Sequence, residues 1–584
     1  MMYPKKIISL IKMSKPIRIV LVLLVIPFLF VGWSSVSLTK LDKKTFHYPM
    51  VIGSVYHLNN IYSVENVPAG YITGSQYKIN VLHYYLNFDL YPEKKLLKGD
   101  VTITGLLLDP NLKNINLNFY DNMKISSLEL NGKKASYSDI GTTLSIPLSD
   151  VSGDTFKVHI VYEGTPKRTG LSSFVFGEIN GQSCVYNLSE PNYASTFFPC
   201  NDIPSDKALL DIKITNDSNE VSVSNGKLVS VTTYGSRRTY YWKSIYPIST
   251  YLICLYSSDY KNFSQKYISQ NKSDTMSIEY YAFPNQLENA KKDFSVNLDL
   301  MNFFAKKFGE YPFIKEKYGV AEILWPLGAM ETQTVTAIGS NFVGGKQFFT
   351  DIYAHELSHH WFGDAVGPMT WKDIWLNEGF ASYCEALWAE HLGGPGALQS
   401  TMMSKFQDDF PGTVYNPGDL FGSTVYNKGA WVLHMLRREV GDSVFFKILR
   451  SYYQKYKYKN ASTKDFENEC EAVSGKNLNF FFNQWVFKGT GIIDLNYNWN
   501  VEKKSGLYQV KINLNQVQTG CKVYKFPLDV KVQFNDRTSS VKTFQIDSRQ
   551  KQLEVEFDKE PVGITLDPDN WLLAKIQLEK NSAE

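Results

Sequence analysis

The spacing of apolar residues divides the chain into three stretches. From about residue 77 to residue 254, apolar and β-branched residues alternate with polar ones, and Gly, Asn and Asp lie between the alternating segments, which predicts strands. From about residue 291 to residue 486, apolar residues recur at helical spacing, as in Leu298–Phe308 and Gln347–Phe362. After residue 489 the alternation returns, as in Leu528–Phe534. The pattern predicts a large β domain, a mainly helical domain and a small β domain.

These stretches indicate a multidomain α+β protein. We expect the large β domain to comprise residues 45–265, the helical domain residues 266–488 and the small β domain residues 489–580. The length agrees, because 584 residues correspond to roughly three to five domains at about 100–200 residues per domain. The sequence contains no fixed-period repeat and no low-complexity linker.

Residues 1–37 have the character of a targeting segment. Basic residues precede the apolar run Ile19–Trp33, and serines follow it. As a helix this run spans about 22 Å, less than the roughly 30 Å of a bilayer core. Such an arrangement is typical of an export signal. Because no A-x-A cleavage site follows, the alternative is a membrane anchor that stays uncut. Both interpretations place the body of the protein outside the cytoplasm, in the periplasm or the extracellular space.

The charge pattern argues against one class of partner. The net charge is +3, but the basic excess lies in the first 37 residues, so the rest of the chain is nearly neutral. A nearly neutral body lacks the basic field that binds phosphates. We therefore expect no nucleic-acid partner.

Six cysteines leave the disulfide pattern open. No CxxC motif is present, so a cluster of thiolate metal ligands is not expected. Six cysteines allow 15 complete pairings, and the sequence does not choose among them. Cys184 with Cys200 is the pair we favour. Cys384 is expected to be a small buried apolar group.

The segment from His355 to His359, HELSH, carries the strongest chemical signal. On a helix, successive residues turn by about 100°, so His355, His359 and Glu356 lie near 0°, 40° and 100° on one arc. Two imidazoles in this arrangement can bind one zinc ion at about 2.0–2.1 Å, while the glutamate faces a fourth ligand. His360, the next residue, is interpreted as a packing or surface histidine.

A third protein ligand is needed for a catalytic zinc site. Glu378 follows His359 by 19 positions and lies at the start of a second predicted helix, which begins near Trp375. The helix that carries the histidines is expected to break at Gly363, so the chain has room to return past the metal. The sequence therefore predicts His355, His359 and Glu378 as the ligands of one zinc ion per chain.

Four segments carry a resemblance to a known family. Residues 355–383, HELSHHWFGDAVGPMTWKDIWLNEGFASY, resemble the zinc core of the gluzincin aminopeptidases, the family of aminopeptidase N and leukotriene hydrolase. Residues 328–332, GAMET, resemble the family's G-[AG]-M-E-N exopeptidase motif, and residues 426–430, YNKGA, resemble the segment with its catalytic tyrosine. Residues 190–207 resemble a substrate-facing loop. The likeness extends over about residues 75–575.

The resemblance implies an architecture. It implies an N-terminal β saddle, a thermolysin-like and mainly helical catalytic domain, and a C-terminal β-sandwich. We expect no C-terminal helical domain of the kind that many members have. Two residues depart from the family pattern: Thr332 replaces the usual Asn, and Leu188 stands where many members have a substrate-binding Gln.

The resemblance also implies roles for individual residues. Zinc acidifies a bound water and polarises the substrate carbonyl. Glu356 takes the proton of that water as general base, and the hydroxyl of Tyr426 donates to the oxyanion. Glu331 and Glu190 hold the α-ammonium group of the substrate, which leaves the first peptide bond over the metal.

A short segment before Glu331 is expected to bind the substrate main chain. The backbone at Gly328 and Ala329 would align the substrate as an added strand, and Met330 would contact its first side chain.

We therefore expect a zinc-dependent aminopeptidase, a hydrolase that removes the N-terminal residue from peptides with a free N-terminus. Two alternatives remain open. One is a zinc endopeptidase, or a member of the family that acts on a non-peptide substrate. The other is a catalytically inactive scaffold that uses the fold for binding. Against the scaffold, the five residues assigned to metal and catalysis are all present. The preferred first residue and the oligomeric state stay open.

Overall fold

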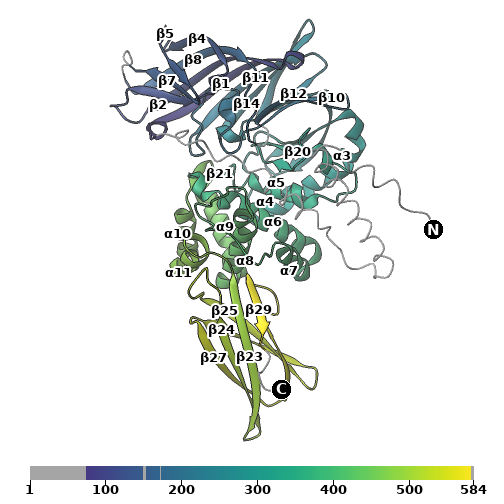
Figure 1. Cartoon of the computed structure of the whole chain (residues 1–584). Coiled ribbons are helices and arrows are strands. Elements are labelled where there is room, and N and C mark those ends of the chain that lie inside the picture. The colour runs from purple at the N-terminus through teal and green to yellow at the C-terminus, as the bar shows by residue number, and fades with distance from the viewer. Residues whose placement is uncertain (1–73, 149–152, 171–172, 580–584) are drawn as a thin grey trace, which may run out of the picture. The chain divides into compact units, whose positions relative to one another are not determined.

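The structure is a computed structural model that describes residues 74–148, 153–170 and 173–579 (Figure 1). These residues belong to one compact unit. The predicted targeting segment, residues 1–37 with the apolar run 19–33, lies outside the described residues. Among the described residues, no helix combines the length and the hydropathy that crossing a membrane requires.

The N-terminal domain is built mainly from strands, as the alternating pattern predicts. Its largest sheet has eight strands in the order β13-β14-β11-β1-β2-β8-β4-β5 (Figure 1). Strand β1 pairs in parallel with β11 and antiparallel with β2. The strands are β1 Ile79–Tyr91, β2 Leu96–Leu107, β4 Lys124–Leu130, β5 Lys133–Lys134, β8 Thr155–Gly164, β11 Lys207–Asp217, β13 Lys227–Tyr234 and β14 Arg237–Ser249.

Two smaller sheets complete this domain. One has the order β12-β15-β10-β9 and the other the order β3-β7-β6. Phe174 of the first packs against Phe197 with ring centroids 5.1 Å apart, and Phe197 also contacts Phe88 of the large sheet, so the sheets share one aromatic core. The strands are β3 Asn114–Asn118, β6 Ser138–Ile140, β7 Thr143–Pro147, β9 Ser173–Ile179, β10 Gln182–Leu188, β12 Val221–Ser224 and β15 Leu255–Ser258.

The second domain begins with a sheet that the helical periodicity does not predict. Its five strands follow the order β16-β17-β18-β20-β19. Strands β17, β18 and β20 are parallel, and β19 pairs antiparallel with β20 at the edge. Strand β18 is buried at every position, which removes the alternation that a half-exposed strand shows. The strands are β16 Lys261–Ile268, β17 Thr275–Ala282, β18 Tyr318–Ile323, β19 Ala329–Met330 and β20 Val335–Gly339.

The helices of this domain agree with the predicted periodicity. The apolar stripe of Leu298–Phe308 forms α4, and the segment 347–362 contains α5, which carries both histidines of the HELSH motif. A small parallel pair, β21 Val366–Pro368 and β22 Lys459–Ala461, joins two loops. The helices are α3 Leu287–Asp293, α4 Asn297–Phe308, α5 Thr350–His359, α6 Trp375–Gly393, α7 Pro395–Ser404, α8 Gly429–Val440, α9 Asp442–Tyr456, α10 Thr463–Ser474 and α11 Asn479–Phe482.

The C-terminal domain is again β. A four-stranded sheet of order β27-β24-β23-β29 and a three-stranded sheet of order β26-β25-β28 bury the alternate residues of their strands, such as Val510 and Ile512 of β24 and Leu528 and Val530 of β25. The strands are β23 Ile493–Lys504, β24 Leu507–Gln516, β25 Phe526–Phe534, β26 Ser539–Ile546, β27 Gln550–Phe557, β28 Pro561–Leu566 and β29 Ala574–Leu578.

The predicted Cys184–Cys200 disulfide is wrong. All six cysteines lie in the described part of the chain, and each is a free thiol there. Cys184 belongs to β10 and its Sγ lies 3.5 Å from the hydroxyl of Tyr260, whereas the backbone of Cys200 pairs with that of Asn118, the last residue of β3. The two thiols therefore pack in different parts of the core. Cys384 is buried on α6, as expected.

Six free thiols make a simple prediction. Protein denatured without reductant should react with about six equivalents of a thiol reagent, because no thiol is consumed in a disulfide. The same sample treated with reductant before the reaction is the control. Four or fewer reactive thiols before reduction and six after it would contradict the structure.

Candidate metal centre

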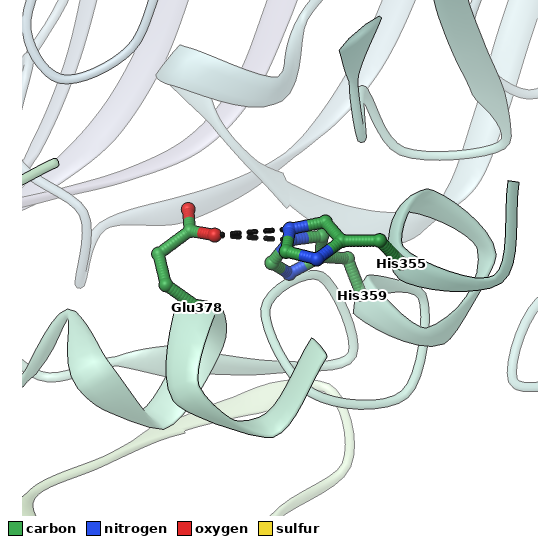
Figure 2. Close-up of side chains that lie close together, drawn as sticks. All are labelled: His355, His359 and Glu378. Atoms are coloured by element: carbon green, nitrogen blue, oxygen red, sulfur yellow. Dashed lines mark hydrogen bonds and ion pairs between the residues drawn. The ribbon is translucent and has the colours of Figure 1, made fainter. Parts of the chain in front are cut away.

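Two helices bring the predicted metal ligands together. His355 and His359 are one helical turn apart on α5, and Glu378 lies in the first turn of α6 (Figure 2). The Nε2 atoms of His355 and His359 lie 3.2 Å and 3.4 Å from Oε2 of Glu378. All three side chains are buried. The structure therefore brings the three predicted metal ligands together.

The spacing of these atoms fits a metal ion. Ligand atoms at about 2.0–2.1 Å from a tetrahedral zinc ion are about 3.3–3.4 Å from one another. The separations of 3.2 Å and 3.4 Å agree with this value. Two imidazole nitrogens and one carboxylate oxygen are also the donor set of known catalytic zinc sites, which keep the fourth position for water or substrate.

The electrostatics of the centre favour a cation. Burial alone would raise the pKa of Glu378, but His359 and His355 hold it at about 2, so the carboxylate is ionised. Burial would lower the pKa of His359, but Glu331 and Glu378 raise it to about 10. The carboxylates therefore outweigh the desolvation of the imidazole, which shows a strongly negative potential at the ligand atoms.

Each histidine is oriented through its second ring nitrogen. Nδ1 of His355 donates to Oε1 of Glu385 at 2.7 Å, and Oε2 of Glu385 accepts from Nζ of Lys405 at 2.6 Å. Nδ1 of His359 donates to the carbonyl of Phe362 at 3.2 Å. These bonds leave both Nε2 atoms directed at the metal position, and such partners fix the tautomer and the ring orientation of metal-binding histidines.

Glu356 lies beside the ligands without being one of them. Its carboxylate belongs to a group with Glu331 and His359 whose ligand atoms are within 4.8 Å of one another. Its Oε2 is buried and has no hydrogen-bond partner among the described residues. Burial, followed by the charge of Glu331, raises the pKa of Glu356 to about 8, against the opposing effect of the histidines. This carboxyl group can therefore hold and release a proton near neutral pH.

Two further carboxylates face the same space. Glu190 follows β10, and Glu331 follows the edge strand β19. Carboxylate atoms of Glu190, Glu331 and Glu378 lie within 4.8 Å of one another. Oε1 of Glu190 and Oε1 of Glu331 are enclosed and have no hydrogen-bond partner among the described residues. Burial, and then the charge of Glu331, raises the pKa of Glu190 well above its ordinary value. These carboxyl groups could hold a second cation, whose charge would favour their ionised forms.

Tyr426 reaches the centre from a third element. It lies in η11, a single π-helical turn over Thr424–Lys428 that leads into α8. Its ring stacks on that of His355 at a centroid distance of 5.9 Å and an interplanar angle of 11°. The side chain is half-buried, so part of the ring is accessible to solvent.

The segment predicted to bind a substrate main chain lies at the edge of the five-stranded sheet. Ala329 and Met330 form β19 and pair with Ile338 and Ala337 of β20. The carbonyl of Gly328 accepts from the amide of Gly339 at 3.0 Å. One side of this segment is thus occupied by β20, and Glu331 follows it directly.

Two family models of known proteins match this chain. Residues 292–485 match the peptidase family M1 domain, and residues 80–252 match the peptidase M1 N-terminal domain. The chain belongs to peptidase family M1. This is the family of the gluzincin aminopeptidases that the sequence motifs resemble, so the predicted family is confirmed.

Relatives in the M1 family share about a quarter of their residues with this chain. Probable aminopeptidase 2 of Sulfurisphaera tokodaii is 25% identical over 76% of this chain and 58% of its own length. Aminopeptidase N of Lactococcus lactis is 27% identical over 69% of this chain and 50% of its own length. The chain therefore spans about half the length of the curated relatives that it matches.

Solved structures of the M1 family match the fold. An M1 zinc metallopeptidase of Deinococcus radiodurans is 26% identical, with a TM-score of 0.61 over 70% of this chain and 93% of that chain. Aminopeptidase A of Legionella pneumophila, solved with aspartic acid, reaches a TM-score of 0.77 over 86% of this chain at 19% identity. At that identity the second match concerns the fold alone.

The two departures from the M1 pattern have a structural context. The hydroxyl of Thr332 bonds to the hydroxyl of Tyr256 at 2.8 Å and donates to the carbonyl of Val335, so it fixes the turn after Glu331. Leu188 is buried at the end of β10 and brings no polar atom to the position where many members have Gln. His360 is enclosed, and its Nδ1 lies 3.0 Å from the hydroxyl of Tyr311, which confirms its interpretation as a packing histidine.

Glu385 and Lys405 are functional residues that the sequence motifs do not indicate. A signal for Glu385 exists, because it follows Glu378 by seven residues, about two helical turns, and so lies on the same face of α6. Lys405 follows α7 and reaches Glu385 only through the packing of α7 on α6. No spacing in the sequence indicates that contact.

The hydrogen bond between His355 and Glu385 predicts a specific effect on metal binding. Glu385→Gln keeps the size of the side chain but weakens its hold on Nδ1 of His355, so zinc affinity should fall about 10–100-fold. The measurement is zinc loss from purified protein to a competing chelator. Glu390→Gln is the matched control, because Glu390 is also on α6 but pairs with Arg437. Equal zinc affinity in both variants would contradict the role of Glu385.

Proposed function

We propose that this chain is a zinc-dependent aminopeptidase that removes the N-terminal residue from peptides with a free N-terminus. The observation that carries the proposal is the position of Glu190 and Glu331. Their unpartnered oxygens lie beside Glu378, so a site for a cationic group adjoins the metal site. A substrate ammonium group in that position would have its first peptide bond next to the metal, and bonds farther along the chain would lie beyond reach.

The metal centre supports hydrolysis. His355, His359 and Glu378 would hold one zinc ion, which supplies Lewis acidity to a carbonyl and lowers the pKa of a water molecule. The neighbouring Glu356 is not among these ligands. Its buried oxygen is free to take a proton from the attacking water, and its raised pKa suits transfer of that proton to the departing amine.

Tyr426 is suited to stabilise the charge that develops on the carbonyl oxygen. Its ring stacks against that of His355, so Tyr426 adjoins one of the proposed metal ligands. A hydroxyl donor directed at a developing oxyanion typically contributes about 10²–10³-fold to the rate.

The substrate backbone would extend along β19. Gly328, Ala329 and Met330 lie at the edge of their sheet, where an extended peptide can add as a further strand. Glu331 follows immediately and would end this strand at the ammonium group. Met330 would contact the first side chain of the substrate.

Names of relatives support this activity. The matched relatives include proteins named aminopeptidase N and glutamyl aminopeptidase, and an M1 zinc metallopeptidase variant of Deinococcus radiodurans was solved with a Tyr-Ser-Ala substrate. The finer architecture belongs to the proposal as well: a β saddle, a thermolysin-like catalytic domain and a C-terminal β-sandwich. So does export or membrane anchoring of the body, which rests on the sequence of residues 1–37.

Two variants separate metal binding from proton transfer. His359→Ala removes a ligand, so purified protein should hold well under one zinc per chain. Glu356→Gln removes the proposed base but no ligand, so zinc should stay near one per chain while turnover falls about 10²–10⁴-fold. Metal analysis and turnover of an aminoacyl-arylamide measure both. Full zinc content in His359→Ala or near-normal turnover in Glu356→Gln would refute the corresponding assignment.

A peptide with a free N-terminus and its acetylated form distinguish the alternatives. The free peptide should lose residues one at a time, and acetylation should slow cleavage more than about 10²-fold, because it removes the charge that Glu190 and Glu331 would bind. Mass spectrometry over time follows both peptides. Glu331→Gln should slow cleavage of the free peptide, whereas Glu322→Gln, a buried control on β18, should not.

The outcomes for the two alternatives differ. Internal cleavage of the acetylated peptide at a similar rate would support an endopeptidase. No cleavage of either peptide by protein with full zinc content would support a scaffold.

A further inference from the structure

The π-helical turn that carries Tyr426 is fixed from two sides. The turn, η11, is π-helical, so its backbone hydrogen bonds join residues five apart, whereas those of an α-helix join residues four apart. Such turns recur at functional sites. Tyr426 is its central residue, with Thr424 and Lys428 at the two ends. The hydroxyl of Thr424 donates to the carbonyl of Pro411 at 2.8 Å. The position of the tyrosine hydroxyl therefore depends on how both ends of this turn are held.

The first side is a direct backbone contact with α6. Gly429 follows the turn and lies against Gly379, which follows the metal-site residue Glu378. A Cβ atom on either glycine would lie 2.9 Å from the Cα atom of the other. Because no side chain separates the two backbones here, the end of the turn lies directly against the residue that follows Glu378.

The second side is a buried lysine. Lys428 is fully enclosed, and its Nζ donates to the carbonyl of Gly489 at 3.1 Å. Gly489 lies in the linker between η12, Asn483–Phe487, and β23 of the C-terminal domain. A Cβ atom there would lie 1.8 Å from the carbonyl oxygen of Gln484, so the backbone of the linker passes close to η12 and requires glycine at this position.

The linker is in turn fixed by the C-terminal domain. The amide of Thr490 donates to the carbonyl of Gly520 at 3.2 Å, and the amide of Lys525 donates to Oε1 of Gln484 at 2.9 Å. The contact of Lys428 thus connects the turn of Tyr426 to the C-terminal β domain.

Stability alone does not account for this lysine. Burial lowers the pKa of Lys428 to about 8, which shows that the enclosed ammonium is held at a cost. A neutral carbonyl is its hydrogen-bond acceptor, and an apolar side chain of equal length would avoid that cost. The lysine is therefore better explained by the position that its hydrogen bond gives to the turn η11.

We propose that Lys428 is a positioning residue for Tyr426. By joining the end of η11 to the linker at Gly489, it holds the Tyr426 hydroxyl over the metal centre. The C-terminal β domain contributes to catalysis in this way without touching the substrate. The inference rests on the proposed role of Tyr426 as oxyanion donor.

A double-mutant cycle tests the proposal. Lys428→Met removes the hydrogen bond and keeps the length of the side chain. We expect kcat to fall about 10–10²-fold with KM and zinc content unchanged, because a misplacement of about 1 Å can cost that much. Tyr426→Phe removes the hydroxyl itself and should lower kcat about 10²–10³-fold. In that background Lys428→Met should change kcat by about twofold or less, because there is no hydroxyl left to position.

The controls separate positioning from charge and from folding. Lys317→Met is the matched control, because Lys317 is equally buried and donates to the carbonyls of Ser224 and Gly226 in the N-terminal domain. It should leave kcat unchanged. The melting temperature of Lys428→Met should be unchanged or higher, since a buried charge is removed. If the methionine variant does not fold, Lys428→Leu, which is also apolar and also lacks the hydrogen-bond donor, replaces it in the cycle.

The cycle also separates this inference from the proposed function. Unchanged kcat in Tyr426→Phe would overturn the role of Tyr426. A full effect of Tyr426→Phe together with no effect of Lys428→Met would overturn only the role of Lys428. An equal loss from Lys428→Met in both backgrounds would also overturn it, because it would show an effect on the charge or packing of the centre that does not pass through the hydroxyl.

Discussion

Carboxylates that are enclosed together repel one another and lose their hydration, and either a bound cation or protonation relieves both effects. Glu378, Glu331, Glu190 and Glu356 surround one space together with two histidines. Their pKa values diverge: Glu378 is held at about 2 by the histidines, whereas Glu356 is raised to about 8. One carboxylate is therefore ready to bind a cation, and another is ready to exchange a proton. The roles of the other residues of the centre follow from this difference between Glu378 and Glu356.

The surrounding fold holds the charged groups at fixed distances. On the side of the N-terminal domain, Nζ of Lys207 donates to the carbonyl of Asp364 at 2.6 Å, and Tyr251 donates to the carbonyl of Gly363 at 3.4 Å. Both contacts fix the loop that follows the histidine helix. On the other side, Glu385 and Lys405 orient His355, and the linker to the C-terminal domain meets the turn of Tyr426. The N-terminal domain thus contacts the loop after the histidine helix, and the linker to the C-terminal domain contacts the turn of Tyr426.

Local patterns made much of this predictable from the sequence. The helical period places His355 and His359 on one face, and Glu378 lies at the start of the next helix. These three ligands could therefore be predicted from local patterns, with the one assumption that the two helices pack against each other. The buried sheet with β18 was missed because a strand enclosed on both faces loses its alternation. Lys405 and Lys428 were missed for another reason: each acts through a contact with a distant segment, and nothing in local spacing encodes such contacts. The disulfide was wrong because cysteine counts carry no distances.

The central claim is that two imidazoles and one carboxylate converge on a single zinc ion. X-ray absorption at the zinc edge of the zinc-loaded protein tests it directly. We expect a first shell of about four nitrogen and oxygen atoms at about 2.0–2.1 Å, with the outer-shell scattering of two imidazole rings. A sulfur shell at about 2.3 Å, or scattering from fewer than two imidazoles, would contradict the assignment of His355, His359 and Glu378.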